Sequence, residues 1–254
     1  MSKTLATATI NLSPAAQEAW VTWARLKSSI STQTIPNTNT TPSTPSTTGT
    51  PNLPGAVTAT NQQIIEAFKK ANPDTYANLT KSDAKLPEKI SQIADHYGLD
   101  LRLLLTSQKL ESNGKTENIT SHAGASGLNQ VMPVTYEHVM KLVNSGKAKL
   151  PAGVTADSLK NYKNDPVANT IVSAIYLKHV VADQLKITNT KALTTEQITK
   201  ILGAYNQGPY GYVASGGANN SETRNHEKKA TNVLASIGNF LGGLTGQNTN
   251  LATA

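Results

Sequence analysis

An uncharged stretch divides this chain and limits where a folded core can form. No charged residue occurs from Ser28 to Ile65, and Thr, Ser, Pro and Asn dominate there. Such a stretch buries too little apolar surface to offset the entropy lost on ordering, so it is predicted to be a linker. We therefore expect an N-terminal arm (1–60), one folded domain (61–245) and a flexible tail (246–254). The domain is large enough to fold without a metal ion or a disulfide.

The arm is expected to be flexible, with one short helix that carries both tryptophans of the chain. Ser13 followed by Pro14 is typical of a helix start, and apolar residues then recur near one helical face. Trp20 and Trp23 lie on that face and are costly to leave in water. They predict a docking site for another protein. Packing of this helix against the folded domain is the alternative.

Helical periodicity recurs through the domain and alternating strand patterns are scarce, so the predicted fold class is mainly α. Gly98 is expected to end one helix and Asp100 to cap the next. Apolar spacing and start signals predict helical segments at 64–70, 87–97, 101–113, 166–181, 195–206 and 221–240.

The third of these segments carries a glutamate in line with its core-facing residues. Leu101, Leu104, Leu105 and Gln108 recur at helical spacing before Glu111. Glu111 is thus expected to be partly buried, and burial disfavours the charged form of a carboxyl group. Because a protonated carboxylic acid is the usual donor to a glycosidic oxygen, Glu111 is a candidate acid/base catalyst. A hydrogen-bonded core glutamate is the alternative.

Several segments around Glu111 occur in the order and spacing of a known family. They are the stretch from Tyr97 to Ser112, the loop from Gly124 to Pro133, the helix start Asp165-Pro166, the segment from Ala204 to Pro209, and Glu222-Thr223-Arg224. Together they resemble the lytic transglycosylases of the SLT type, lysozyme-like enzymes that cut bacterial peptidoglycan. The resemblance runs from about residue 86 to residue 234.

The resemblance implies a lysozyme-like fold and a set of site residues. Glu111 stands at the catalytic position. In this family one glutamate protonates the leaving oxygen and then deprotonates the C6 hydroxyl of N-acetylmuramic acid, which closes a 1,6-anhydro ring. Peptidoglycan glycan strands are therefore the expected substrate, and no cofactor is expected. The residues implied to bind the sugars are Ser121, Gly127, Leu128, Asn129, Gln130, Tyr205 and Asn206.

Two positions depart from the family's pattern. Asn129 stands where the loop usually has methionine, which is expected to change the floor of the groove. His226 stands where the closing helix usually has tyrosine. Neither change removes the acid.

Composition argues against several other classes of function. The chain has no cysteine, which excludes disulfides and thiolate metal sites, and its five histidines lack metal-ligand spacing. The net charge of +7 suits a polyanion, either nucleic acid or the cell wall. No nucleic-acid-binding module is present, and no run reaches the length of a membrane span.

The first 12 residues contain no secretory signal, so an enzyme for the cell wall needs another route there. We expect a bacteriophage virion location, with action in the periplasm or wall of the host during genome delivery. A bacterial secretion-machine component is the second choice, and an endolysin released by a holin the third. Trp20 and Trp23 are then expected to bind other virion or secretion-machine proteins.

Two alternatives to transglycosylation stay open at the level of sequence. A hydrolytic muramidase on the same scaffold would need a second carboxylate, for which Asp157, Asp165 and Glu117 are candidates. A structural or ejection protein of the virion with a degenerate lysozyme-like domain would need none.

Overall fold

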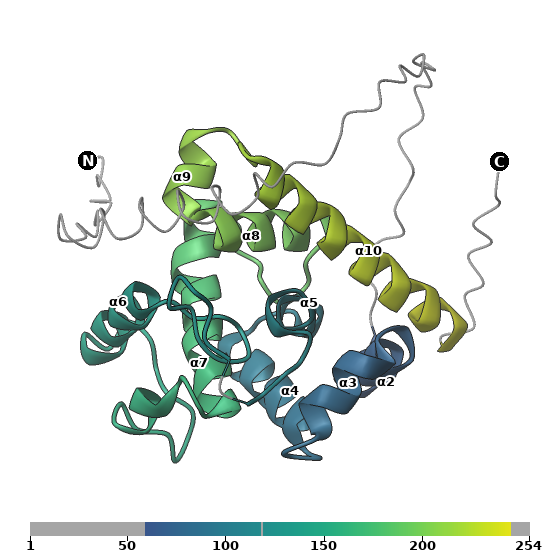
Figure 1. Cartoon of the computed structure of the whole chain (residues 1–254), viewed down its shortest axis with the longest axis horizontal. Helices are drawn as coiled ribbons and strands as arrows, with labels where there is room; N and C mark the ends of the chain where they lie inside the picture. The colour runs from purple at the N-terminus through teal and green to yellow at the C-terminus, as the bar shows by residue number, and fades with distance from the viewer. Residues whose placement is uncertain (1–58, 118, 245–254) are drawn as a thin grey trace, which may run out of the picture.

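The computed structural model describes residues 59–117 and 119–244, which form a bundle of helices (Figure 1). No strand occurs among these residues, so the predicted mainly α fold class is confirmed. Residues 1–58 of the arm, with the predicted tryptophan helix, and the tail from residue 246 lie outside the described residues. The helices are α2 (Asn61–Ala71), α3 (Pro73–Thr80), α4 (Leu86–Tyr97), α5 (Leu101–Ser112), α6 (Pro133–Asn144), η1 (Ser158–Asn161), α7 (Pro166–Tyr176), η2 (Leu177–Ala182), α8 (Thr195–Gln207), α9 (Pro209–Ala214) and α10 (Ser221–Leu244).

Helix α5 lies near the centre of the bundle (Figure 1). The side chains of Leu103, Leu104 and Leu105 are fully buried, and α2, α4, α8 and α10 all contact this helix. Burying a leucine side chain stabilises a fold by roughly 1.5–3 kcal/mol. The end of α5, where Glu111 lies, is therefore held by packing from several directions.

Asp100 fixes the start of α5, as the sequence predicted. Its carboxylate accepts hydrogen bonds from the backbone N–H of Arg102 (3.0 Å) and of Leu193 (3.1 Å). The same carboxylate forms a 2.6 Å ion pair with the Arg102 guanidinium. Gly98, with φ +60°, ends α4 in the left-handed conformation that favours glycine. The short connection between α4 and α5 thus sets the direction in which α5 enters the core.

Helix α10 closes the bundle by packing on α8, α2 and α5. Thr223, Ala230, Leu234 and Ile237 recur on its buried face at helical spacing. The Thr223 hydroxyl donates a hydrogen bond to the Asn206 side chain of α8 (3.1 Å). These contacts place the first two turns of α10 beside the end of α5, although the two helices are far apart in sequence.

All six predicted helical segments are observed, but the structure adds helices and alters one segment. Helices α3, α6 and α9 were not predicted. The segment expected to run from 166 to 181 is an α-helix only to Tyr176 and continues as the π-helix η2. The widened turn keeps Leu177 and Val181 fully buried. It also lets the Lys178 ammonium donate a hydrogen bond to the Tyr97 carbonyl at the end of α4.

Candidate active site

Glu111 lies in the last turn of α5 with its side chain only 7% exposed. The helix ends one residue later at Ser112, and Asn113 then turns the chain away with φ +54°. Gln108, one turn earlier, is fully buried on the same face of α5. Glu111 therefore lies where the core-facing side of this helix reaches the protein surface. The partial burial predicted for Glu111 is observed.

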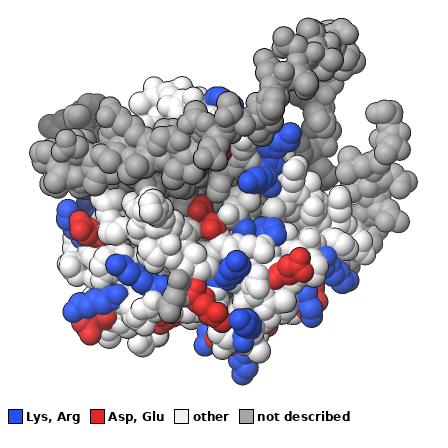
Figure 2. Space-filling view, in the orientation of Figure 1, with Lys and Arg blue, Asp and Glu red and all other residues white. Residues whose placement is uncertain are grey.

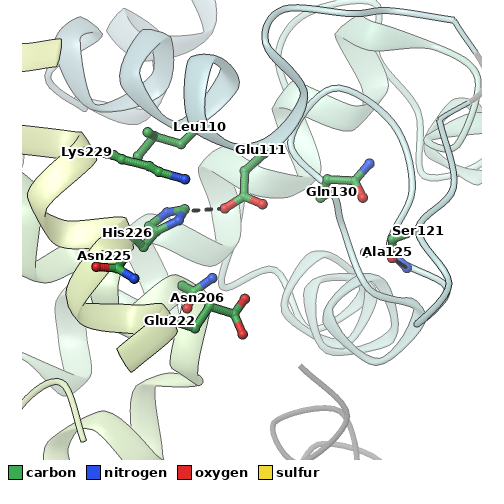
Figure 3. Close-up of a pocket in the computed structure, with 10 residues that line it drawn as sticks. All are labelled: Leu110, Glu111, Ser121, Ala125, Gln130, Asn206, Glu222, Asn225, His226 and Lys229. Carbon is green, nitrogen blue, oxygen red and sulfur yellow. Dashed lines mark hydrogen bonds and ion pairs between the residues drawn. The ribbon is translucent and has the colours of Figure 1, made fainter. Parts of the chain in front are cut away.

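The imidazole of His226 contacts this carboxyl group (Figure 3). Its Nε2 atom lies 3.5 Å from Glu111 Oε1, and its side chain is 11% exposed. His226 was identified from the sequence as a departure from the family's pattern, but its contact with Glu111 was not predicted. The sequence feature that could have predicted this contact is Glu222-Thr223-Arg224, which resembles the start of the family's closing helix. In the structure this helix is α10, and its second turn lies at the site.

Glu111 and His226 lie on the wall of a pocket of about 350 Å³. This volume is within the range of small-ligand sites in proteins. Four parts of the chain contribute to the wall: the end of α5, the loop after it, the end of α8 and the start of α10. The lining residues are Leu110, Glu111, Ser121, Ala125, Gln130, Asn206, Glu222, Asn225, His226 and Lys229.

Three of the predicted sugar-binding residues line this pocket together with Glu111: Ser121, Gln130 and Asn206. Ser121 is held in a tight turn, where its Oγ accepts a hydrogen bond from the Ala125 N–H (3.1 Å). Gln130 has φ +46°, which is unusual for a residue with a side chain. Its amide donates to the Gly127 carbonyl (3.0 Å). Strained backbone of this kind often occurs at functional sites, where the surrounding structure holds it.

The other four predicted sugar-binding residues lie behind the pocket wall. Gly127, Leu128 and Asn129 are buried, and Tyr205 is 7% exposed. The Tyr205 hydroxyl donates to the Asn129 carbonyl (2.8 Å). None of these four residues lines the pocket. Their contribution to sugar binding stays a prediction, and their observed contacts support the loop.

Asn169 of α7 holds the buried side of this loop. Its Oδ1 accepts hydrogen bonds from the backbone N–H (2.7 Å) and the side-chain amide (3.2 Å) of Asn129. Its Nδ2 donates to the carbonyls of Ser126 and Tyr162, both at 2.9 Å. The Asn129 side chain thus points into the core toward α7. Asparagine at this position makes a polar contact with Asn169 and does not line the pocket.

The three carboxylates considered as partners for Glu111 do not line the pocket. Asp165 caps α7 and accepts from the Val167 N–H (2.8 Å). Asp157 and Glu117 are exposed, and they pair with Lys160 (2.5 Å) and Lys81 (3.0 Å). The second carboxylate that does line the pocket is Glu222, in the first turn of α10.

Charge around the domain is mixed in sign. On the face shown in Figure 2, Lys and Arg are interspersed with Asp and Glu over the described part of the surface.

Within residues 59–117 and 119–244, no group of three or more His, Asp or Glu side chains is arranged to hold a metal ion. No helix in the same residues is both long and apolar enough to cross a membrane.

A comparison with protein families gives one match. The model of the family described as "Transglycosylase SLT domain" matches residues 88–230, more than half of the chain. The matched segment contains Glu111 and all the other residues that line the pocket. No curated protein and no solved structure matches the chain.

Proposed function

This chain belongs to the SLT transglycosylase family, and on that premise we propose that it is a peptidoglycan lytic transglycosylase. It cleaves the glycosidic bond between N-acetylmuramic acid and N-acetylglucosamine and leaves a 1,6-anhydro end. One observation carries the proposal: a nearly buried carboxyl group, Glu111, lies on the wall of a pocket with polar side chains around it. The pocket holds a candidate acid together with groups that can bind a sugar.

The reaction needs one group that first gives and then takes a proton. Protonated Glu111 donates its proton to the glycosidic oxygen as the bond from that oxygen to C1 of N-acetylmuramic acid breaks. The Glu111 carboxylate then takes the proton of the C6 hydroxyl as O6 bonds to C1. The sugar's own acetamide helps to stabilise the positive charge between the two steps. Ser121, Gln130 and Asn206 offer hydrogen bonds that can orient the sugar rings.

The first test is Glu111→Gln. The amide keeps the shape of the side chain but can neither donate nor accept the catalytic proton, so cleavage of purified sacculi should fall by roughly 10²–10⁴-fold or more. The melting temperature should change little. Glu137→Gln, at an exposed position of α6, is the matched control and should retain full activity. Activity of Glu111→Gln within tenfold of the wild type would exclude Glu111 as the catalyst.

Hydrolysis is the second candidate outcome, because Glu222 also lines the pocket and could activate a water molecule. Mass spectrometry of the digested murein separates the two. Anhydro ends support the transglycosylase, whereas reducing ends support a muramidase. If no product forms, the domain has only a structural role in a larger assembly.

We further propose that a bacteriophage particle carries this enzyme and uses it to penetrate the cell wall during genome delivery, with a bacterial secretion machine as the alternative. The support is the arm: its uncharged Thr/Ser/Pro-rich stretch suits a spacer, and Trp20 and Trp23 suit an anchor in a protein interface. Immunodetection of the protein in purified particles checks this proposal, and its absence from them would contradict it.

A further inference from the structure

His226 is the one pocket residue whose side chain is in ion-pair distance of Glu111 among the described residues. Glu111 Oε1 is buried and accepts no hydrogen bond from the described part of the chain. A buried carboxylate oxygen without a donor is costly, and the cost is largest when the carboxyl group is charged. The imidazole is therefore the group placed to stabilise the charged form.

The helix that carries His226 is well fixed. Thr223, three residues earlier, is fully buried and bonded to Asn206 of α8. Ala230, four residues later, is also fully buried. In addition, Glu227 accepts a 2.6 Å hydrogen bond from Tyr212 of α9. Because both neighbouring turns are anchored, the imidazole is presented to Glu111 from a rigid support.

The contact involves only one of the two oxygens of the Glu111 carboxyl group. Figure 3 shows Oε1 facing His226, while the other oxygen points away from it, on the side of Gln130. The oxygen that His226 does not engage is the one left to exchange a proton with a sugar in the pocket. Acid/base catalysis requires the carboxyl group to be held in one orientation, since small errors of placement are costly.

We propose that His226 is a positioning residue which replaces the family's usual tyrosine, holds Oε1 of Glu111 and stabilises the carboxylate formed after proton donation. This inference rests on the proposed transglycosylase function. In the cycle, Glu111 gives its proton to the leaving oxygen, the His226 N–H then donates to Oε1, and Glu111 later regains a proton from the C6 hydroxyl. The imidazole itself gains and loses no proton.

Other titratable groups lie near Glu111 and His226 and can also affect how these two side chains respond to pH. Negative charge on Glu111 raises the pKa of the Tyr205 phenol, after burial, which is the larger cause. Tyr205 of α8 is therefore within electrostatic range of the carboxyl group. The groups to be considered with the pair are Lys229 and Glu222 of α10 and Tyr205 of α8.

The test compares His226→Gln with His226→Asn and His226→Phe. The amide nitrogen of glutamine can reach nearly the same place as Nε2, whereas asparagine is too short and phenylalanine has no donor. We expect kcat to fall roughly 10- to 100-fold in the Asn and Phe variants with little change in KM, and to recover largely in the Gln variant. Lys228→Ala, an exposed neighbour outside the pocket, is the control and should behave as wild type. If Asn and Gln variants have equal kcat, or if the loss appears in KM alone, the proposal is wrong.

A readout independent of activity separates this inference from the proposed function. The ring nitrogens of His226 can be followed by NMR as the pH is changed, in the wild type and in Glu111→Gln. The proposal predicts that the wild-type signal responds to ionisation of Glu111 and that this response is lost in the variant. Identical titration curves would overturn it. If the His226 signal responds to Glu111 but the wild type releases no murein fragments, the proposed function is wrong. The inferred interaction between His226 and Glu111 is then still supported.

Discussion

At the scale of single residues, two buried tyrosines are expected to respond differently to replacement by phenylalanine. Burial raises the pKa of both phenols well above the usual value, so both hydroxyl groups stay neutral. The Tyr205 hydroxyl donates to the Asn129 carbonyl in the loop behind the pocket (2.8 Å). The Tyr97 hydroxyl is also buried but has no hydrogen-bond partner among the described residues. Only one of the two hydroxyl groups therefore contributes a bond to the fold.

Tyr205→Phe should lower the free energy of unfolding by about 1–2 kcal/mol, because it leaves the Asn129 carbonyl without this donor in a buried site. Cleavage of murein should fall as well, since the loop that carries Gln130 is loosened. Tyr97→Phe is the matched control and should leave stability unchanged or raised. Urea denaturation of the two variants checks the difference. Equal effects of the two substitutions would mean that the bond to Asn129 contributes nothing.

At the scale of elements, the loop after α5 is held on α7 by the side chain of Asn169. Its four hydrogen bonds reach Asn129, Ser126 and Tyr162, and Asn169 is fully buried. Gly127 packs directly on the same amide. A Cβ atom at this position would lie 2.3 Å from Asn169 Nδ2, and its φ of +75° is unfavourable for any other residue. The loop and α7 thus form one unit.

Asn169→Ala should lower the free energy of unfolding by about 2–4 kcal/mol, because it leaves several buried backbone groups unsatisfied. Gly127→Ala should be similarly destabilising, since it displaces the same amide. The two losses should not add: the double variant should be less destabilised than the sum, because the second change disturbs a contact that is already lost. A double-mutant cycle by urea denaturation measures this, with exposed Asn164→Ala as the control. Strict additivity would show that the two positions act separately.

At the scale of the whole molecule, the sequence predicted the elements better than the walls of the pocket. Caps such as Asp100 and stops such as Gly98 act over a few residues, so they were predicted correctly. The π-helix η2 was not predictable, because its residues also suit an α-helix and tertiary packing decides the register. Helix α6 has a readable signal, Pro133 at its start, which was interpreted only as the end of the loop.

The lining of the pocket was also only partly predictable from the sequence. Glu111, Ser121, Gln130 and Asn206 converge as the resemblance implied. The pattern of the loop could not tell which residues face the pocket and which face α7, because both sets alternate within a few positions. It also could not show that α10 supplies His226, more than 100 residues after Glu111, since that contact depends on how α10 packs on α8 and α5.

The last prediction concerns stability in acid, which depends on one buried and one partly buried histidine. His138 of α6 is 4% exposed, and its Nε2 atom has no hydrogen-bond partner among the described residues. Burial, and to a lesser extent Lys141, lowers the pKa of His138. Burial is also the main cause that lowers the pKa of His179, with Lys178 in the same direction and Asp183 opposing. Both groups resist protonation in the folded state.

The sign of the effect follows from proton binding. Below the pKa of an unfolded histidine, about 6.5, the unfolded chain binds more protons at these positions than the folded chain, so stability falls as the pH falls. His138, the more deeply buried of the two, contributes at most roughly 1.4 kcal/mol per pH unit in that window. His138→Phe should therefore flatten the loss of unfolding free energy between about pH 6.5 and pH 5, whereas His122→Gln, in an exposed loop, should not. Urea denaturation at several pH values measures both slopes. An unchanged slope in His138→Phe would show that protonation of His138 does not limit the stability of the domain in acid.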